Sequence, residues 1–301
     1  MSINEKLFEQ VYEECLSVID ATNDINVKSK RMKFGAAYQS MCKEPDPEHT
    51  LFNSCVHELR TYQYLIDKGF SVSASKDDDK HGGPDFNVES LGYVECVICT
   101  RGKPGTEPRK YVDEQLAKES NRYTAALPRL TTAIKEKRDK YAKYLCQGII
   151  SPDTPRIIAV GVTIFSNLVH ADSIVELTEQ ILCGAGEELF YCNKKTGQFL
   201  EAPGVETRCY NDSGKKTIEK ELKLNYFALD EYRDVSAVIL INNSIGEKLT
   251  DAHFSVFLNP NATVPVPVDA LKTLNYLIRA DATEQKETYQ WHKNGSQIQP
   301  D

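Results

Sequence analysis

The chain has 301 residues, of which 41% are hydrophobic, enough for one large domain or two modest ones. It contains no run of eighteen apolar residues, so no transmembrane helix is expected, and its N-terminus lacks the basic start and apolar stretch of a signal peptide. The net charge of −8 argues against a protein that coats nucleic acid indiscriminately. We therefore expect a cytoplasmic protein that does not associate with membranes.

Two helices are predicted at the N-terminus. Asn4–Asp20 carries apolar side chains at helical spacing, which gives it one buried face. A second helix is predicted over Val27–Cys42, with an N-cap at Asn23-Asp24. We interpret residues 1–48 as an N-terminal helical extension that packs either on the rest of the chain or on another copy of it in a homo-oligomer.

A third helix and a first core strand follow this extension. Thr50–Lys68 places apolar residues on one side, and Gly69 closes the helix. Phe70–Ser75 alternates as a strand.

A β-hairpin is predicted next, from Asp85–Val88 and Tyr93–Thr100. Because strand side chains alternate between faces, Glu95 shares a face with Tyr93, Val97 and Cys99. A carboxylate buried there without a partner costs several kcal/mol, so a cation, a hydrogen-bond network or a functional pocket is needed. Asp85 and Glu95 stand on neighbouring strands, in positions to hold a divalent metal between them.

The same strand contains an apparent C-x-x-C pair, Cys96 and Cys99. Residues three apart in a strand point to opposite faces, so we expect no shared redox or zinc chemistry. The chain has nine cysteines with no repeated spacing, which favours reduced thiols.

A basic segment comes directly after the hairpin. Residues 101–143 hold twelve Lys or Arg and six Asp or Glu, a local charge of +6. Helices are predicted over Lys110–Asn121 and Pro128–Leu145, beyond a Gly/Pro loop at Arg101–Arg109. One side of the second helix carries Arg129, Thr132, Ala133, Lys137, Lys140 and Tyr144.

The remaining chain alternates strands and helices. The predicted elements are a buried strand at Arg156–Phe165, a helix at Asp172–Cys183, a hairpin at Phe190–Leu200, strands at Ala237–Asn242 and Phe254–Leu258, and a short helix at Val268–Ala280. The two later strands are expected to extend the sheet. Residues 284–301 are interpreted as a polar C-terminal tail.

The spacing of the acidic residues resembles the motif of a known nuclease superfamily. Pro84-Asp85 is followed, after nine residues, by Glu95-Cys96-Val97, which is similar to the PD-(D/E)XK motif of the restriction-endonuclease-like superfamily, with Val97 in place of its lysine. More closely, the chain resembles an uncharacterised bacterial group of about this length with the motifs GPDF, (I/V)EAV and NPxATxPxP. The matching stretches are Gly83–Phe86, Tyr93–Val97, Leu127–Ile150 and Asn259–Pro267.

This resemblance implies an α/β fold with an αβββαβ core and a mixed sheet, placed here in residues 49–283, with C-terminal strands added. It implies Mg²⁺ or Mn²⁺ bound by Asp85 and Glu95, and an acidic residue from the first core helix, here Glu58. Arg129 or Lys137 is expected to replace the missing lysine, each positioned cation being worth about 2–4 kcal/mol. The expected activity is metal-dependent hydrolysis of nucleic acid, with DNA as the favoured substrate, in bacterial defence or DNA processing. The nucleic acid is expected to bind through the basic segment of residues 101–143.

Other interpretations stay open beside this one. Glu58 is equally a surface glutamate paired with Arg60 or a lysine, and the cations of the basic segment equally a solvated helix face with pairs such as Glu136–Lys140. The valine at position 97 and the acidic net charge favour a catalytically inactive nuclease-fold protein with a binding or regulatory role. A structural role centred on the N-terminal helices is the third hypothesis, with Glu95 locked in a buried pair.

Overall fold

The structure is a computed structural model that describes most of the chain. The described residues are 3–43, 49–75, 82–102, 122–162, 171–184, 190–192, 199–201, 204–210, 217–223, 225–247, 249–274, 276–283, 286–293 and 296–297. The predicted helix at Lys110–Asn121 lies outside them, as does most of the predicted loop at Arg101–Arg109.

Helices and strands alternate along most of the chain. In order they are α1 (Ile3–Ala21), α2 (Ile25–Lys43), α3 (Thr50–Asp67), β1 (Val72–Ala74), β2 (Phe86–Val88), β3 (Gly92–Ile98), α5 (Arg122–Cys146), β4 (Arg156–Gly161), α7 (Ala171–Cys183), β5 (Phe190–Cys192), β6 (Phe199–Glu201), β7 (Gly204–Tyr210), β8 (Thr217–Lys223), β9 (Ala237–Ile241), β10 (Phe254–Leu258), β11 (Tyr276–Thr283), β12 (Lys286–Lys293) and β13 (Ser296–Gln297). Single 3₁₀ turns, η2 to η5, connect the later strands.

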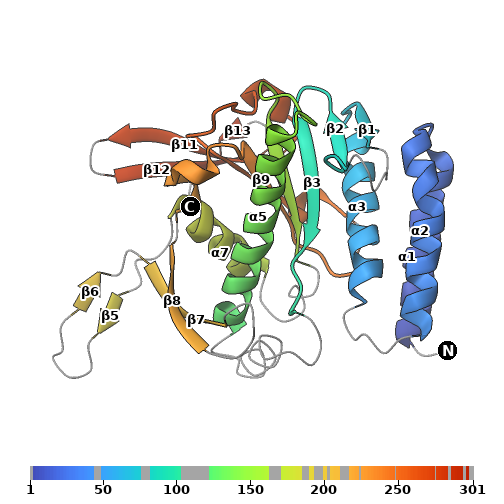
Figure 1. The fold of residues 1–301 in the computed structure, drawn as a ribbon, viewed down its shortest axis with the longest axis horizontal. Coiled ribbons are helices and arrows are strands. Elements are labelled where there is room, and N and C mark those ends of the chain that lie inside the picture. Colours follow the sequence, from blue (N-terminus) through green and yellow to red (C-terminus); the bar gives the residue numbers. More distant parts are fainter. Residues whose placement is uncertain are drawn as a thin grey trace.

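A nine-stranded mixed sheet forms the centre of the molecule, in the order β1-β2-β3-β4-β9-β10-β11-β12-β13 (Figure 1). Strands β1, β2 and β3 form an antiparallel meander, whereas β3, β4 and β9 run parallel to one another. Helix α5 connects β3 to β4. The predicted α/β class with a mixed sheet is confirmed, and β9 and β10 extend the sheet as expected.

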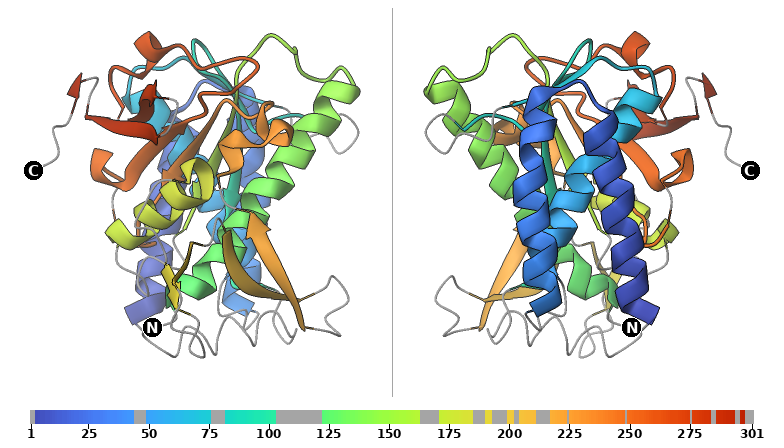
Figure 2. Two further views of the ribbon diagram at one scale, coloured as in Figure 1. Left: turned by 90° about the vertical axis from the view of Figure 1, so that its left-hand side faces the viewer. Right: turned by 90° about the vertical axis from the view of Figure 1, so that its right-hand side faces the viewer.

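Helices cover both faces of this sheet. Helices α1, α2 and α3 lie on one side of it, and α5 and α7 on the other (Figures 1 and 2). The buried side chains of β4 alternate accordingly: Ile157 and Ala159 join the core with α3, while Ile158 and Val160 join the core with α5. A strand buried on both faces explains why this part of the sequence is continuously apolar.

The N-terminal extension packs on α3, one of the two arrangements that the sequence predicts. Phe34 of α2 stacks on Phe52 of α3 with ring centroids 5.5 Å apart, and Arg60 Nη2 donates to Glu14 Oε2 at 3.1 Å. Of the predicted N-cap residues Asn23 and Asp24, Asp24 caps α2, because its Oδ1 accepts a hydrogen bond from Asn26 N at 2.8 Å.

The turn before α2 also contacts the first strand of the sheet. Asp24 Oδ2 accepts from the Ala74 backbone N–H at 2.7 Å, and Asn26 Nδ2 donates to the Ala74 carbonyl at 2.7 Å. Both backbone groups of Ala74 are therefore bonded to side chains of the extension.

The C-terminal region differs from the prediction. The helix predicted at Val268–Ala280 is wrong beyond a single 3₁₀ turn at Val268–Leu271, because Tyr276–Thr283 is a strand that pairs with β10 and β12. Residues 284–301, expected to form a polar tail, contain β12 and β13. Pairing with neighbouring strands stabilises polar segments whose own pattern does not indicate a strand. Strands β7 and β8 form an antiparallel pair that was not predicted from the sequence.

Neither a membrane span nor a disulfide is found in the described part of the chain. No helix there is both long enough and apolar enough to cross a bilayer. No disulfide joins the seven cysteines whose side chains the structure describes, and Cys96 and Cys99 join cores on opposite faces of the sheet, as predicted.

Candidate active site

Glu95 occupies the middle of β3 and its side chain is 0% exposed. It points to the α5 face of the sheet, because Tyr93, Val97 and Cys99 on alternate positions contact the core that contains α5. The shared face predicted from the sequence is therefore confirmed. A carboxylate in this position needs partners to offset its loss of hydration.

Helix α5 supplies those partners. Lys137 Nζ lies 2.6 Å from Glu95 Oε2, and Lys140 Nζ lies 3.0 Å from the same oxygen. The two lysines are three residues apart, so they share the helix side that packs on the sheet through Ile134 and Tyr141. Lys137 is 16% exposed and Lys140 is 40% exposed, so the ion pair reaches solvent on the Lys140 side.

The third contact of Glu95 comes from one turn farther along α5. The Tyr144 hydroxyl lies 3.1 Å from Glu95 Oε1 and donates to the Gly83 carbonyl at 2.8 Å. Tyr144 therefore joins the buried carboxylate to the segment that precedes Asp85.

Asp85 lies beside Glu95. The pairing of β2 with β3 ends at Phe86 and Val94, and Asp85 and Glu95 are the next residues along the two strands. Asp85 Oδ2 accepts a hydrogen bond from the Cys96 backbone N–H at 2.7 Å. The two carboxylates predicted to act together are therefore neighbours across the hairpin.

Glu58 approaches from the other face of the sheet, on α3. Its Oε1 bonds to the ammonium of Lys30 on α2. Burial raises the pKa of the Glu58 carboxyl, and the nearby charge of Asp85 raises it further, whereas Lys30 lowers it. Asp85 is thus electrostatically connected to carboxylates on both of its sides, since burial and the charge of Asp85 also raise the pKa of Glu95.

Arg129 lies away from the carboxylates. Its guanidinium donates to the carbonyl of Thr100 and, at 3.2 Å, to the Thr100 hydroxyl. Of the two cations predicted as replacements for the motif lysine, Lys137 is the one at Glu95. The contacts of Lys140 and Tyr144 with Glu95, and of Lys30 with Glu58, were not predicted. The position of Lys140 and Tyr144 on the same side of the helix as Lys137 was the sequence feature that could have indicated the first two.

A buried histidine supports the α3 face behind the site. His57 Nε2 lies 3.1 Å from the Ala159 carbonyl, and a Cβ at Gly161 would meet His57 Nδ1 at 2.6 Å. Burial lowers the pKa of His57 to about 4, so the ring is neutral at pH 7. The glycine in β4 makes room for this ring.

The donor set fits one kind of metal site. Mg²⁺ is commonly held by one or two carboxylates, with water and substrate phosphates completing its shell, and Asp85 and Glu95 provide two. The residues described contain no group of three or more His, Cys, Asp or Glu side chains that could hold a metal. Because both lysines bond Oε2 of Glu95, a cation there has to use Oε1 or displace an ammonium. Two carboxylates leave open positions on a bound metal for water and substrate phosphates.

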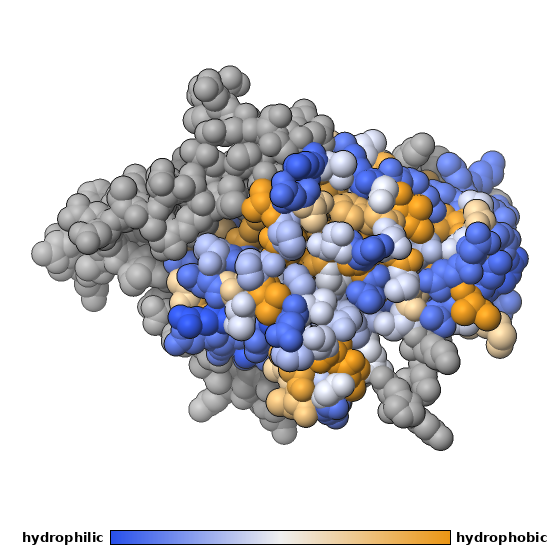
Figure 3. Space-filling model, turned by 90° about the horizontal axis from the view of Figure 1, so that it is seen from above, coloured by the Kyte–Doolittle hydropathy of each residue, from blue (hydrophilic) through white to orange (hydrophobic). Residues whose placement is uncertain are grey.

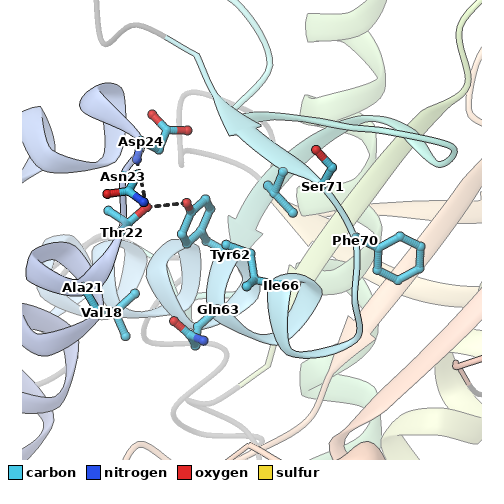
Figure 4. A pocket seen from close by; sticks show the side chains of 11 residues that line it. Val18, Ala21, Thr22, Asn23, Asp24, Tyr62, Gln63, Ile66, Phe70 and Ser71 are labelled. Atoms are coloured by element: carbon cyan, nitrogen blue, oxygen red, sulfur yellow. Dashed lines mark hydrogen bonds between the residues drawn. The ribbon is translucent and has the colours of Figure 1, made fainter.

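A separate hollow of about 590 Å³ lies between the α1–α2 turn, the end of α3 and the segment leading into β1 (Figure 4). The hydroxyls of Thr22 and Tyr62 bond at 2.7 Å on its wall. None of the predicted site residues lines it.

Comparison with known proteins gives no match: no family model, no curated protein and no solved structure matches this chain.

Proposed function

We propose that this protein is a metal-dependent phosphodiesterase that cleaves nucleic acid, with DNA as the expected substrate. One observation carries the proposal. The ammonium of Lys137 lies 2.6 Å from Glu95, beside Asp85, where it supplies the positive charge that Val97 does not. A carboxylate pair with an adjacent ammonium is a set of groups suited to phosphoryl chemistry.

The order of elements supports the same proposal. Helix α3, strands β1, β2 and β3, helix α5 and strand β4 follow one another as αβββαβ, with β3 and β4 parallel. We assign these elements to a restriction-endonuclease-like core. In this core both carboxylates come from the β2–β3 hairpin and the ammonium groups come from α5.

Each residue has a distinct role in this proposal. Asp85 and Glu95 would hold Mg²⁺ or Mn²⁺ together with substrate phosphates, and a metal there would supply a water of lowered pKa. Lys137 orients Glu95 and neutralises negative charge that develops on the phosphate. Lys140 carries the more exposed ammonium, which exchanges Glu95 for the same phosphate. Glu58 supports Asp85 from the α3 side.

A second function is favoured by one specific observation. Glu95 is 0% exposed and bonded to two ammonium groups, a closed arrangement that suits a nuclease fold without hydrolysis. Such a protein would bind nucleic acid or regulate a partner, with the ion pair serving stability alone.

Metal binding separates the two functions. Isothermal calorimetry with Mn²⁺ is performed on the wild type, on Asp85→Asn and on Glu136→Gln, an exposed acidic residue of α5 that serves as the control. The phosphodiesterase predicts heat of binding that Asp85→Asn abolishes and Glu136→Gln retains.

Cleavage of labelled DNA and RNA completes the test. Lys137→Gln is expected to lower the cleavage rate by about 10²–10³-fold, the typical effect of removing one group that stabilises developing negative charge. Absence of metal binding at millimolar Mn²⁺, with no cleavage of either nucleic acid, would contradict the phosphodiesterase and leave the binding protein.

A further inference from the structure

Helix α2 is basic in a chain that is acidic. It carries Lys28, Lys30, Arg31, Lys33 and Lys43 and no acidic residue, although the net charge of the chain is −8. The end of the molecule that carries α1 and α2 is largely hydrophilic when seen from above (Figure 3). A second basic segment therefore exists besides residues 101–143, and it belongs to the N-terminal extension.

One side of α2 faces Glu58 and the edge of the sheet. Lys30 lies on the buried side with Phe34, and its ammonium bonds to Glu58. Asn26 donates to Ala74 of β1 at 2.7 Å, which fixes the side of α2 that faces the sheet edge. Lys33 is seven residues after Asn26, two turns along the same side of the helix, and it is exposed.

The electrostatics agree with this placement. Burial is the main cause that raises the pKa of Glu58, and the charges of Lys30 and then Lys33 oppose the rise. Lys33 is thus close enough to act on a carboxylate that itself interacts with Asp85.

Lys28 provides a contrast on the same helix. At about 100° per residue, it lies about 140° around the helix axis from Lys33 and about 160° from Lys30, and it is exposed. Lys28 and Lys33 are therefore both exposed lysines, but they lie on different sides of the helix.

We propose that Lys33 contacts a backbone phosphate of the nucleic acid whose cleaved bond lies at Asp85 and Glu95, so that α2 forms the wall of the substrate site opposite α5. This inference rests on the proposed function. A polyanion is the occupant that fits, since cations of α2 and α5 flank a site whose own carboxylates repel phosphate. Lys30 is a positioning residue that holds α2 against Glu58.

The test measures binding to a fluorescent DNA duplex by anisotropy, at salt concentrations from about 50 to about 200 mM and with a chelator to prevent cleavage. Lys33→Gln is expected to weaken binding and to reduce the slope of log K against log salt by about 0.9, the loss of one phosphate contact. Lys28→Gln is the matched control and is expected to leave the slope unchanged.

The outcomes separate this inference from the proposed function. A wild type that binds DNA, with an unchanged slope for Lys33→Gln or equal losses for both variants, overturns the α2 wall and leaves the nuclease proposal intact. A slope reduced only by Lys33→Gln, in a protein that cleaves nothing with Mn²⁺, supports the wall and overturns hydrolysis. A wild type that binds neither duplex nor single-stranded DNA or RNA overturns both and points to an acidic protein as the partner of α2.

Discussion

Two carboxylate–ammonium pairs lie on opposite faces of the same sheet, and they are built differently. Glu95 is completely buried and bonded to two lysines of α5, the helix that connects β3 to β4. Glu58 is 14% exposed on its side chain and is bonded to Lys30, which the N-terminal extension contributes. Helix α5 thus supplies the ammonium groups for Glu95, whereas Glu58 depends on α2 of the N-terminal extension for its ammonium.

The difference has a consequence for the charge of the site. Glu58, Asp85 and Glu95 are matched by three ammonium groups, so the cluster is balanced without a metal. A divalent cation adds positive charge to a balanced cluster, and an anionic phosphate restores the balance. In the proposed phosphodiesterase, metal and substrate are therefore expected to bind better together than separately.

Removing both lysines of α5 breaks the buried pair and is expected to have the largest effect. Lys137→Met combined with Lys140→Met leaves Glu95 without an ammonium, and the free energy of unfolding is expected to fall by about 3–5 kcal/mol in urea denaturation. The control is Lys135→Met combined with Lys143→Met, two exposed lysines of the same helix. A loss as small as that of the control would show that the pair contributes no stability.

The second prediction concerns pH dependence on the α3 face. Burial depresses the pKa of His57 from 6.5 to about 4, so the unfolded chain binds more protons between these values. Stability from this group is complete above pH 6.5 and is lost as the pH falls toward 4, by up to about 3 kcal/mol. The raised pKa values of Glu58 and Glu95 act in the opposite direction.

His57→Gln isolates this contribution, because glutamine keeps a donor for the Ala159 carbonyl and does not titrate. The difference in unfolding free energy between wild type and variant is expected to shrink between pH 7 and pH 4. A difference that stays constant across this range would mean that His57 titrates as in the unfolded chain.

The third prediction concerns the pair that spans the extension. Lys30→Met leaves Glu58 partly buried without its ammonium, and the expected loss of stability is about 2 kcal/mol. Adding Glu58→Leu is expected to recover most of this loss, because both charges are then absent. Lys28→Met, on the exposed side of α2, is the control. No recovery in the double variant would indicate that Lys30 acts through contacts other than Glu58.

The sequence indicates the arrangement around Glu95 because local periodicity determines it. The two-residue period of β3 places Glu95 on the face of Val97, and the helical period of α5 places Lys137 on the side facing the sheet. The choice between Arg129 and Lys137 is not available from periodicity. They share a side but lie about 12 Å apart along the helix, and the packing of α5 against β3 decides which one reaches Glu95.

The contacts of α2 are not predictable in the same way. Lys30 meets Glu58 only because α2 and α3 pack together, and no pattern within either helix reveals the partner. The strands β11 to β13 are similar, since their pairing with β10 and with one another decides their conformation.

The contacts between the α1–α2 turn and Ala74 have a further consequence, for association between molecules. Strand β1 is at the edge of the sheet, and an edge strand offers unpaired N–H and carbonyl groups on which another chain can add a strand. At Ala74, Asp24 takes the N–H and Asn26 takes the carbonyl. The extension thus occupies the outward backbone groups of Ala74 with side chains, which is expected to hinder the addition of a strand at this end of β1.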